Sequence, residues 1–329
     1  MARNIVINRK APVNLNLEDA FLFSHEMQIT APKPKVHCGY WGCFDIHIFA
    51  SYGHKIDKQM GVFEQRTFHW RLLFSTKLVI GYTVVFDLWS ANYFHWLTEV
   101  LPKLLFLIEK KQITTILIPA SLYKKEFVHQ SLKILPNEIK VKIISAPHRY
   151  FLPVYKYCSL GVHSGNFHPD IICQLREKMW NAFFATSEQV EQQKEIIFIY
   201  RNLSERRGIV NFSEVEVVLA QKNVKVVNFS VLTFREQIVL MRRCAMLIGV
   251  HGAGLTNMLF TNPGTRILEL RKKGDAHNNC YFSLASALGL PYYYLQCEVD
   301  SAEKLTQECN FIVDVNQFSD CLSRIFQNS

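Results

Sequence analysis

Long apolar runs are absent from this sequence of 329 residues. The first residues, MARNIVINRKAPVNLN, lack the apolar core of about 7–15 residues that a secretion signal contains. The most apolar segment, residues 92–111, is interrupted by Glu99, Pro102 and Lys103, and a membrane-spanning helix needs about 18 uninterrupted apolar residues. We therefore expect a soluble cytoplasmic protein, with peripheral association at the inner face of the cell membrane as an option.

Several metal and nucleotide signatures are also missing. The nine cysteines include no C-x-x-C pair, and HCGYWGC (residues 37–43) has no second ligand pair to complete a four-ligand zinc site. The chain has neither G-x-G-x-x-G nor a Walker motif, and GVHSG (residues 161–165) lacks the spacing of a hydrolase elbow. These absences disfavour dinucleotide-dependent dehydrogenases, P-loop enzymes and hydrolases of that type. We expect reduced thiols and no bound metal.

Acidic residues are outnumbered by basic ones, 28 against 37, which gives a net charge of +9 and a pI of about 9.0. A positive protein attracts an anionic partner such as a nucleic acid, an anionic membrane or a phosphate-bearing substrate. The basic pairs are scattered without a Lys/Arg tract, and no nucleic-acid-binding motif is present. The charge therefore favours a phosphate-bearing small molecule over nucleic acid.

Short apolar strands alternate with amphipathic helices from residue 81 onward. The spacing of Phe94, Leu97 and Leu101 predicts a helix over residues 92–110. Further helices are predicted at 121–132, 169–184, 213–221, 233–244, 255–260 and 281–288, and strands at 81–88, 113–119, 139–145, 150–160, 196–200, 224–229, 245–249, 266–270 and 291–296. This alternation indicates an α/β fold with two doubly wound, Rossmann-like sheets.

The polar segment 186–195 is the predicted linker between two domains. The first domain then covers residues 1–190, of which residues 1–75 form an irregular, β-rich elaboration. The second domain covers residues 191–329. Its last part, residues 301–329, is predicted to form a strand and a helix that pack back on the first domain.

Three loops that directly follow strands of the second domain carry groups suited to a diphosphate. They contain Arg201, Arg206, Arg207 and Asn211; His251, Gly252, Ala253 and Gly254; and Glu269. Guanidinium groups bind phosphate oxygens bidentately, and glycines at a strand-to-helix turn let backbone N–H groups approach a diphosphate. His251 can add a donor, and Glu269 can accept hydrogen bonds from ribose hydroxyls. Each signal alone is ordinary turn or surface chemistry, but their convergence on one sheet edge predicts a nucleoside-diphosphate site.

In the first domain, the polar residues gather at the start of the helix over 92–110. Asp87 ends a strand and Asn92 can cap the helix, while His95 and Glu99 share one helical face. A His–Glu pair is a plausible acid–base unit, and a solvated helix face is the alternative. The aromatic residues Trp89, Tyr93, Phe94 and Trp96 are either a stacking platform for sugar rings or part of the core.

Three segments occur in a familiar order: NYFHWLTEVLPKL, YRNLSERRGIVN and GVHGAGLTNMLFTNPGTRILEL. Over residues 80–298 the chain resembles glycosyltransferase family 61. The resemblance implies a GT-B fold, with the acceptor side in the first domain and a nucleotide-sugar donor, expected to be a UDP-sugar, in the second. By motif match it places Arg201, Arg206 or Arg207, the His251 loop, Asn257 and Glu269 at the donor. Asp87, Asn92, His95 and Glu99 then face the cleft.

The resemblance further implies inverting transfer in a single displacement, which needs a base and positive groups at the leaving diphosphate. Glu99 or His95 is the expected base, followed by Asp87. No D-x-D motif is present, so we expect no obligatory divalent ion and no cofactor besides the donor as co-substrate. Because no export signal is recognised, the expected acceptor is a glycan or lipid-linked glycan used for cell-surface polysaccharide such as capsule. The alternative is a non-catalytic nucleotide- or polyanion-binding module of degenerate transferase fold.

Overall fold

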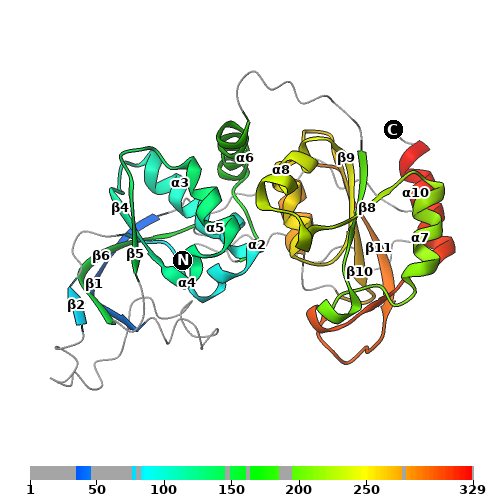
Figure 1. The fold of residues 1–329 in the computed structure, drawn as a ribbon, viewed down its shortest axis with the longest axis horizontal. Coiled ribbons are helices and arrows are strands. Elements are labelled where there is room, and N and C mark those ends of the chain that lie inside the picture. The colour runs from blue at the N-terminus through cyan, green and yellow to red at the C-terminus, as the bar shows by residue number, and fades with distance from the viewer. Residues whose placement is uncertain are drawn as a thin grey trace, which may run out of the picture. The chain divides into compact units, whose positions relative to one another are not determined.

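The computed structural model describes residues 35–45, 76–78, 83–144, 149–160, 164–184, 195–275 and 279–327. The chain divides into two compact units, formed chiefly by residues 31–163 and residues 164–329 (Figure 1). Each unit contains a six-stranded sheet with parallel strands and helices packed against it. The α/β class predicted from the alternation of strands and helices is therefore confirmed. Most of residues 1–75, where the β-rich elaboration was predicted, lies outside the described residues.

The sheet of the first unit has the order β1-β6-β3-β4-β5, with β2 beside β6. The strands are β1 (Lys35–Asp45), β2 (Thr76–Leu78), β3 (Thr83–Val84), β4 (Thr115–Pro119), β5 (Lys140–Ile144) and β6 (Arg149–Ser159). β3, β4, β5 and β6 are parallel, and β1 is antiparallel to β6. The parallel strands thus follow the Rossmann order 3-2-1-4, which reverses direction between β3 and β6.

The predicted helix over 92–110 is present but contains a wider turn. Asn92 caps it by accepting from the backbone N–H of Phe94. Helix α2 (Tyr93–His95) continues into a π-helical turn, η4 (Trp96–Val100), and then into α3 (Leu101–Glu109). Pro102 accounts for the wide turn, because proline has no N–H for the carbonyl four residues earlier and its ring clashes with that carbonyl. Single π turns of this kind are frequent at functional sites.

The neighbouring helix predicted over 121–132 is broken into α4 (Ala120–Tyr123) and α5 (Glu126–Ser131). Lys125 adopts extended backbone between them. No glycine or proline marks the break in the sequence, so apolar spacing alone could not locate it.

The sheet of the second unit has the order β12-β11-β10-β9-β7-β8. The strands are β7 (Glu195–Tyr200), β8 (Lys225–Asn228), β9 (Cys244–Val250), β10 (Arg266–Lys272), β11 (Tyr292–Val299) and β12 (Phe311–Ile312). The first five are parallel and follow the order 2-1-3-4-5, while β12 is antiparallel to β11. The strand order reverses between β7 and β9. In such sheets ligands bind beyond the carboxyl ends of the strands at this switch point.

Helices cover both faces of this sheet. They are α6 (Pro169–Phe183), α7 (Phe212–Gln221), α8 (Phe234–Arg242), the short helix η8 (Ala253–Phe260), α9 (Cys280–Ala287) and α10 (Val315–Gln327). α7 and α10 lie side by side on one face, opposite α8 (Figure 1). Leu219 of α7 and Phe318 of α10 are completely buried against Ile248 and Leu268 of the sheet. Each such side chain contributes about 1.5–3 kcal/mol through removal from water.

One of the predicted boundaries differs from this organisation. Helix α6 was assigned to the first domain, 1–190, but it belongs to the second compact unit. It packs against α9 and η8, and the Trp180 Nε1–H donates to the carbonyl of Phe260 at 3.0 Å. For the segment 301–329 the structure shows that α10 packs against α7 of its own unit, and its packing back on the first domain stays a prediction. Both segments have an apolar face, but the spacing of their apolar residues does not show which element that face packs against.

Among the described residues, no helix is both long and apolar enough to cross a bilayer.

Candidate functional site

The loops after β7 and β9 meet at the switch point of the second sheet. These two strands are direct neighbours, with Ile199 paired to Gly249. Because parallel strands point the same way, the arginine loop that begins at Arg201 and the turn at His251 emerge at one edge. This is the juxtaposition that the sequence predicted for the diphosphate site.

Arg207 lies against the glycine turn. A Cβ atom added to Gly252 would stand 3.3 Å from Arg207 Nη1, which is tighter than most carbon contacts. The absence of a side chain at Gly252 therefore lets the guanidinium approach the backbone. Within the described part of the chain, Arg207 Nε is buried without a hydrogen-bond partner. Burial, followed by the positive charge of Arg201, lowers the pKa of Arg207. An anion would satisfy both features, since it supplies an acceptor and opposite charge.

The backbone at Arg206 and Arg207 is held in unusual conformations. Their φ angles are +61° and +57°, a region that side chains other than glycine rarely occupy. For Arg206 the ψ angle is 157°, which gives a combination essentially restricted to glycine. A segment of the same chain, residues 309–310, holds this turn in place. Arg207 N–H donates to the carbonyl of Cys309 at 3.0 Å, and Gly208 N–H donates to Asn310 Oδ1 at 3.1 Å. Strain of this kind, about 1–3 kcal/mol per residue, clusters at binding sites.

This strain leads to a paired prediction at Arg206, whose side chain is exposed. Arg206→Gly and Arg206→Ala remove the same guanidinium, but only glycine relieves the backbone. We expect Arg206→Gly to be more stable than Arg206→Ala by about 1 kcal/mol. Chemical denaturation of both variants tests this. Equal stability of the two would show that the left-handed conformation is not maintained in solution.

The remaining glycines of the turn serve close packing. A Cβ on Gly254 would stand 3.1 Å from Ile199 Cγ2, so glycine lets the start of η8 approach β7. Asn257 is 1% exposed, and its Nδ2 donates to the carbonyl of Gly254 at 3.0 Å. Asn257, which the motif match placed at the donor, therefore holds the loop, while Ala253 is partly exposed at the start of η8. Asn211 also acts structurally, because its side chain bonds to the backbone of Val313.

His251 belongs to a buried polar network behind the turn. Its Nδ1 contacts Oε1 of Glu269, and the hydroxyl of Tyr292 donates to Oε2 of the same carboxylate. Arg271 Nη1 lies 3.6 Å from Glu269 Oε2. The ring of Tyr281 meets the imidazole edge-on, with 4.9 Å between ring centroids. The two carboxylate oxygens of Glu269 are thus occupied by partners from the turn after β9, from β10 and from β11.

The position of Glu269 corrects its predicted role. Its side chain is 0% exposed, so its carboxylate offers no surface to a ribose hydroxyl. Burial by itself would raise the pKa of Glu269, but the charges of Arg271 and His251 and the hydrogen bonds from His251 and Tyr292 hold it below its ordinary value. Glu269 is therefore an ionised group that orients His251. The strand-end position predicted that Glu269 belongs to the site but not which way it faces.

The sequence interpretation missed Arg271, Tyr281 and Tyr292. Arg271 could have been found, because it stands two residues after Glu269 on one strand and therefore shares its face. Tyr292 and Tyr281 come from β11 and α9, far along the chain, and no local pattern connects them with His251.

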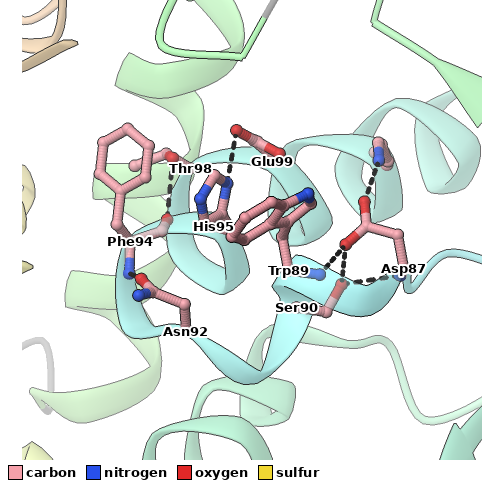
Figure 2. Close-up of polar contacts among 9 residues, drawn as sticks. Asp87, Trp89, Ser90, Asn92, Phe94, His95, Thr98 and Glu99 are labelled. Atoms are coloured by element: carbon pink, nitrogen blue, oxygen red, sulfur yellow. Dashed lines mark hydrogen bonds and ion pairs between the residues drawn. The ribbon is translucent and has the colours of Figure 1, made fainter. Parts of the chain in front are cut away.

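In the first unit, His95 and Glu99 form the predicted pair. His95 Nδ1 lies 2.9 Å from Glu99 Oε1, and both side chains are partly exposed (Figure 2). The ring of Trp89, which is 40% exposed, lies with its centroid 5.5 Å from that of the imidazole. An ionised Glu99 accepts from Nδ1–H, so the neutral imidazole has its lone pair on Nε2. Nε2 has no hydrogen-bond partner within the described ranges and is free for a ligand.

Asp87 is engaged as a helix cap. Its Oδ1 accepts from Trp89 N–H at 3.0 Å and from the hydroxyl of Ser90 at 2.8 Å, and its Oδ2 lies 3.5 Å from Lys103 Nζ. Figure 2 shows Asp87 turned toward this cap and not toward His95. Both oxygens are in use, which favours a positioning role for Asp87 over that of a base.

Of the four aromatic residues, two are clearly core. Trp96 is 0% exposed and donates from Nε1 to Ser131 Oγ at 2.8 Å, and Phe94 is buried. Tyr93 is partly buried and meets Phe127 edge-on. Trp89 is thus the one that combines exposure with proximity to His95. In the described ranges no three His, Cys, Asp or Glu side chains are grouped as a metal site would require.

Comparison with known proteins yields one family and two relatives. The family described as Glycosyltransferase 61 matches residues 93–268, a range that includes His95, Glu99, Arg207 and His251. An EGF domain-specific O-linked N-acetylglucosamine transferase of Xenopus laevis is 34% identical over 112 residues, which cover 32% of this chain and 21% of the relative. The protein of the same name from Drosophila melanogaster is 35% identical over 104 residues, covering 31% and 20%. The matched part spans about a fifth of each relative's length.

Proposed function

Since the chain belongs to the glycosyltransferase 61 family, we propose that it transfers a sugar from a UDP-sugar to an acceptor hydroxyl with inversion at the anomeric carbon. In this proposal the fold is of the GT-B class, with the donor held by the second unit and the acceptor by the first. No metal ion takes part, because cationic side chains serve the leaving diphosphate. The location is cytoplasmic, with peripheral contact to the membrane.

One observation carries the proposal: Arg207 lies against Gly252 at the switch point of a doubly wound sheet. The pair combines a partly buried guanidinium, whose Nε lacks an acceptor among the described residues, with backbone that has no side chain to block a ligand. Arg201 adds a second positive charge, which a free protein tolerates only at a cost. A diphosphate has the charge and the oxygen atoms to satisfy this arrangement.

The acceptor chemistry belongs to the first unit. His95 Nε2 takes the proton of the acceptor hydroxyl, and Glu99 stabilises the imidazolium through Nδ1–H. The acceptor oxygen attacks the anomeric carbon as the bond from this carbon to the phosphate oxygen breaks. Trp89 provides an exposed aromatic face for the acceptor sugar. UDP departs with the electron pair, and Arg201, Arg207 and His251 stabilise its charge.

The names of the relatives guide the choice of substrates. Both are named as N-acetylglucosamine transferases of EGF domains, so UDP-N-acetylglucosamine is the first donor to test. For the acceptor we propose a glycan or a lipid-linked glycan of cell-surface polysaccharide. A folded EGF domain is the second acceptor to test.

UDP should raise the melting temperature of the wild-type protein by several degrees, through preferential binding to the folded state. We expect His251→Ala to abolish this shift, since it removes a donor to the diphosphate. A panel of UDP-sugars, followed by mass spectrometry for released UDP, then identifies the donor. The matched control is His129→Ala, a change to an exposed histidine outside both sites, which should keep the shift. The absence of a shift with UDP or any other nucleoside diphosphate in the wild type would refute the donor site.

The second candidate function is a non-catalytic module that binds nucleotides or polyanions. The net charge of +9 favours it. It requires salt-sensitive binding to polyanions and no release of UDP from any donor. The donor panel separates the two functions.

A further inference from the structure

The turn at Arg207 is held by a segment that none of the three predicted loops includes. This segment, residues 300–310, joins β11 to β12. We propose that Asn310, oriented by Asp300, is a positioning residue for donor binding, because it holds the backbone that places Arg207 against Gly252. The inference rests on the proposed function, since it takes the diphosphate to be the ligand of Arg207.

Hydrogen bonds from this segment and from β12 fix the backbone of the turn. Arg207 N–H donates to the carbonyl of Cys309 at 3.0 Å. Gly208 N–H donates to Asn310 Oδ1 at 3.1 Å, and the carbonyl of Gly208 accepts from Phe311 N–H at 2.8 Å. Of these three bonds, the one to Asn310 involves a side chain, so it is the one that a substitution can remove.

Asp300 determines which way the amide of Asn310 points. Its Oδ1 accepts from the backbone N–H of Asn310 and its Oδ2 accepts from Nδ2, each at 3.0 Å. Asp300 N–H also donates to the carbonyl of Asn310 at 3.0 Å. An ionised carboxylate can only accept, so it selects the amide orientation in which Nδ2 faces Asp300. Oδ1 is then the atom that faces Gly208 N–H.

The turn needs such support because its backbone is strained. Arg206 and Arg207 have φ angles of +61° and +57°, and residues other than glycine keep this conformation only where their surroundings impose it. Without the bond to Asn310, the turn can relax and the Arg207 guanidinium can move away from Gly252. Because the Asn310 amide bonds to the backbone of the turn, its effect on the donor passes through Arg207.

Other contacts keep the segment in place when that amide is removed. The Sγ of Cys309, a buried residue, lies 3.1 Å from the carbonyl of Ser301. Lys272 Nζ, at the end of β10, donates to the carbonyls of Ala302 and Lys304 at 2.7 and 2.6 Å. A substitution at position 310 should therefore disturb the turn and leave the rest of the segment folded.

Titration calorimetry with UDP on the chain of 329 residues tests the role of Asn310. Asn310→Ala removes the acceptor of Gly208 N–H, so the Kd of UDP should rise about tenfold, through the lost hydrogen bond and the displaced cation. The matched control is Asp314→Ala, which removes a side-chain acceptor 3.0 Å from the backbone N–H of Gln317 in α10. Both variants should melt at a lower temperature than the wild type, but the control should keep the wild-type Kd.

A reciprocal exchange of the two side chains tests the orientation by Asp300. Asn310→Asp alone sets two carboxylates side by side, and their repulsion should turn the side chain at position 310 away from Gly208 and weaken UDP binding about tenfold. Combination with Asp300→Asn allows every bond to form again. The carboxylate at position 310 accepts from Gly208 N–H, and the amide at position 300 donates to that carboxylate and accepts from the backbone N–H of residue 310. The double variant, whose net charge equals that of the wild type, should bind UDP within about twofold of the wild type.

The outcomes separate this inference from the proposed function. If the wild type binds UDP and Asn310→Ala binds it equally well, the positioning role is overturned and the donor site stands. A double variant that binds as weakly as Asn310→Asp would equally overturn the inference. Circular dichroism establishes whether Asn310→Ala folds, and the comparison of Asn310→Asp with the double variant decides the question if it does not. If the wild type binds no nucleoside diphosphate, the proposed function fails and this inference falls with it.

Discussion

His95→Ala is expected to lower kcat about 10²–10⁴-fold, the range that a general base contributes, while the Kd of UDP stays within about twofold. The reason is that the proposed base and the proposed donor site lie in different units. His95 lies after β3 of the first unit, whereas the arginine loop and the His251 turn belong to the second. Loss of the base slows attack by the acceptor hydroxyl but leaves the cations of the donor site in place. Single-turnover transfer and UDP titration measure the two effects separately.

Glu99→Gln shows which member of the pair takes the proton. If His95 is the base, the variant keeps some activity and its pH profile shifts, because Glu99 acts by stabilising the imidazolium across the 2.9 Å contact. If Glu99 is the base, the glutamine variant is as impaired as His95→Ala and His95→Gln is only mildly affected. Full activity of Glu99→Gln would contradict a role for Glu99 in the reaction. Glu109→Gln, an exposed change at the end of the same helix, is the matched control.

The fold was largely predictable because its strands and helices are long enough to show their periods. The apolar stripe that begins with Phe94 and the apolar runs of β7 and β9 are buried, as their spacing predicts. The break at Lys125 and the π turn before Pro102 were not predicted, since they depend on one local clash or on backbone geometry. The spacing of apolar residues also could not reveal that α6 belongs to the second unit. It shows that one face of the helix is buried, but not which element that face packs against.

At the candidate site, the sequence predicted which residues lie close together better than it predicted how each side chain is oriented. His251, Gly252 and Arg207 follow strand ends, and the parallel sheet brings these ends together without further information. The direction in which the Glu269 side chain points could not be predicted in this way. A residue at a strand end can face a ligand or the interior, and only the neighbouring strands decide this. Tyr292 illustrates the limit, because it meets Glu269 through pairing of β10 with β11, 23 positions away in the chain.

The buried carboxylate at Glu269 also gives the largest stability effect that we expect. Glu269→Gln keeps the size of the side chain but leaves Arg271 buried without its counterion. Breaking such a pair costs about 3–5 kcal/mol, and the donors of His251 and Tyr292 lose charge-assisted partners as well. Hydrogen exchange of peptides from β9 and β10, measured across a urea series, reports the free energy of opening of this unit.

The matched control is Glu298→Gln, on the neighbouring strand β11. Glu298 Oε1 lies 2.6 Å from Lys273 Nζ, but both side chains are 65% exposed, so this change should cost less than about 1 kcal/mol.

The pH dependence of stability gives an independent check on Glu269. Because the fold lowers the pKa of Glu269, its contribution is complete above the unfolded value of about 4.3 and is lost as the pH falls through the folded value. The difference between the wild type and Glu269→Gln should therefore be constant near neutrality and shrink below about pH 4. Equal costs for the two glutamine variants would show that the interior around Glu269 is hydrated.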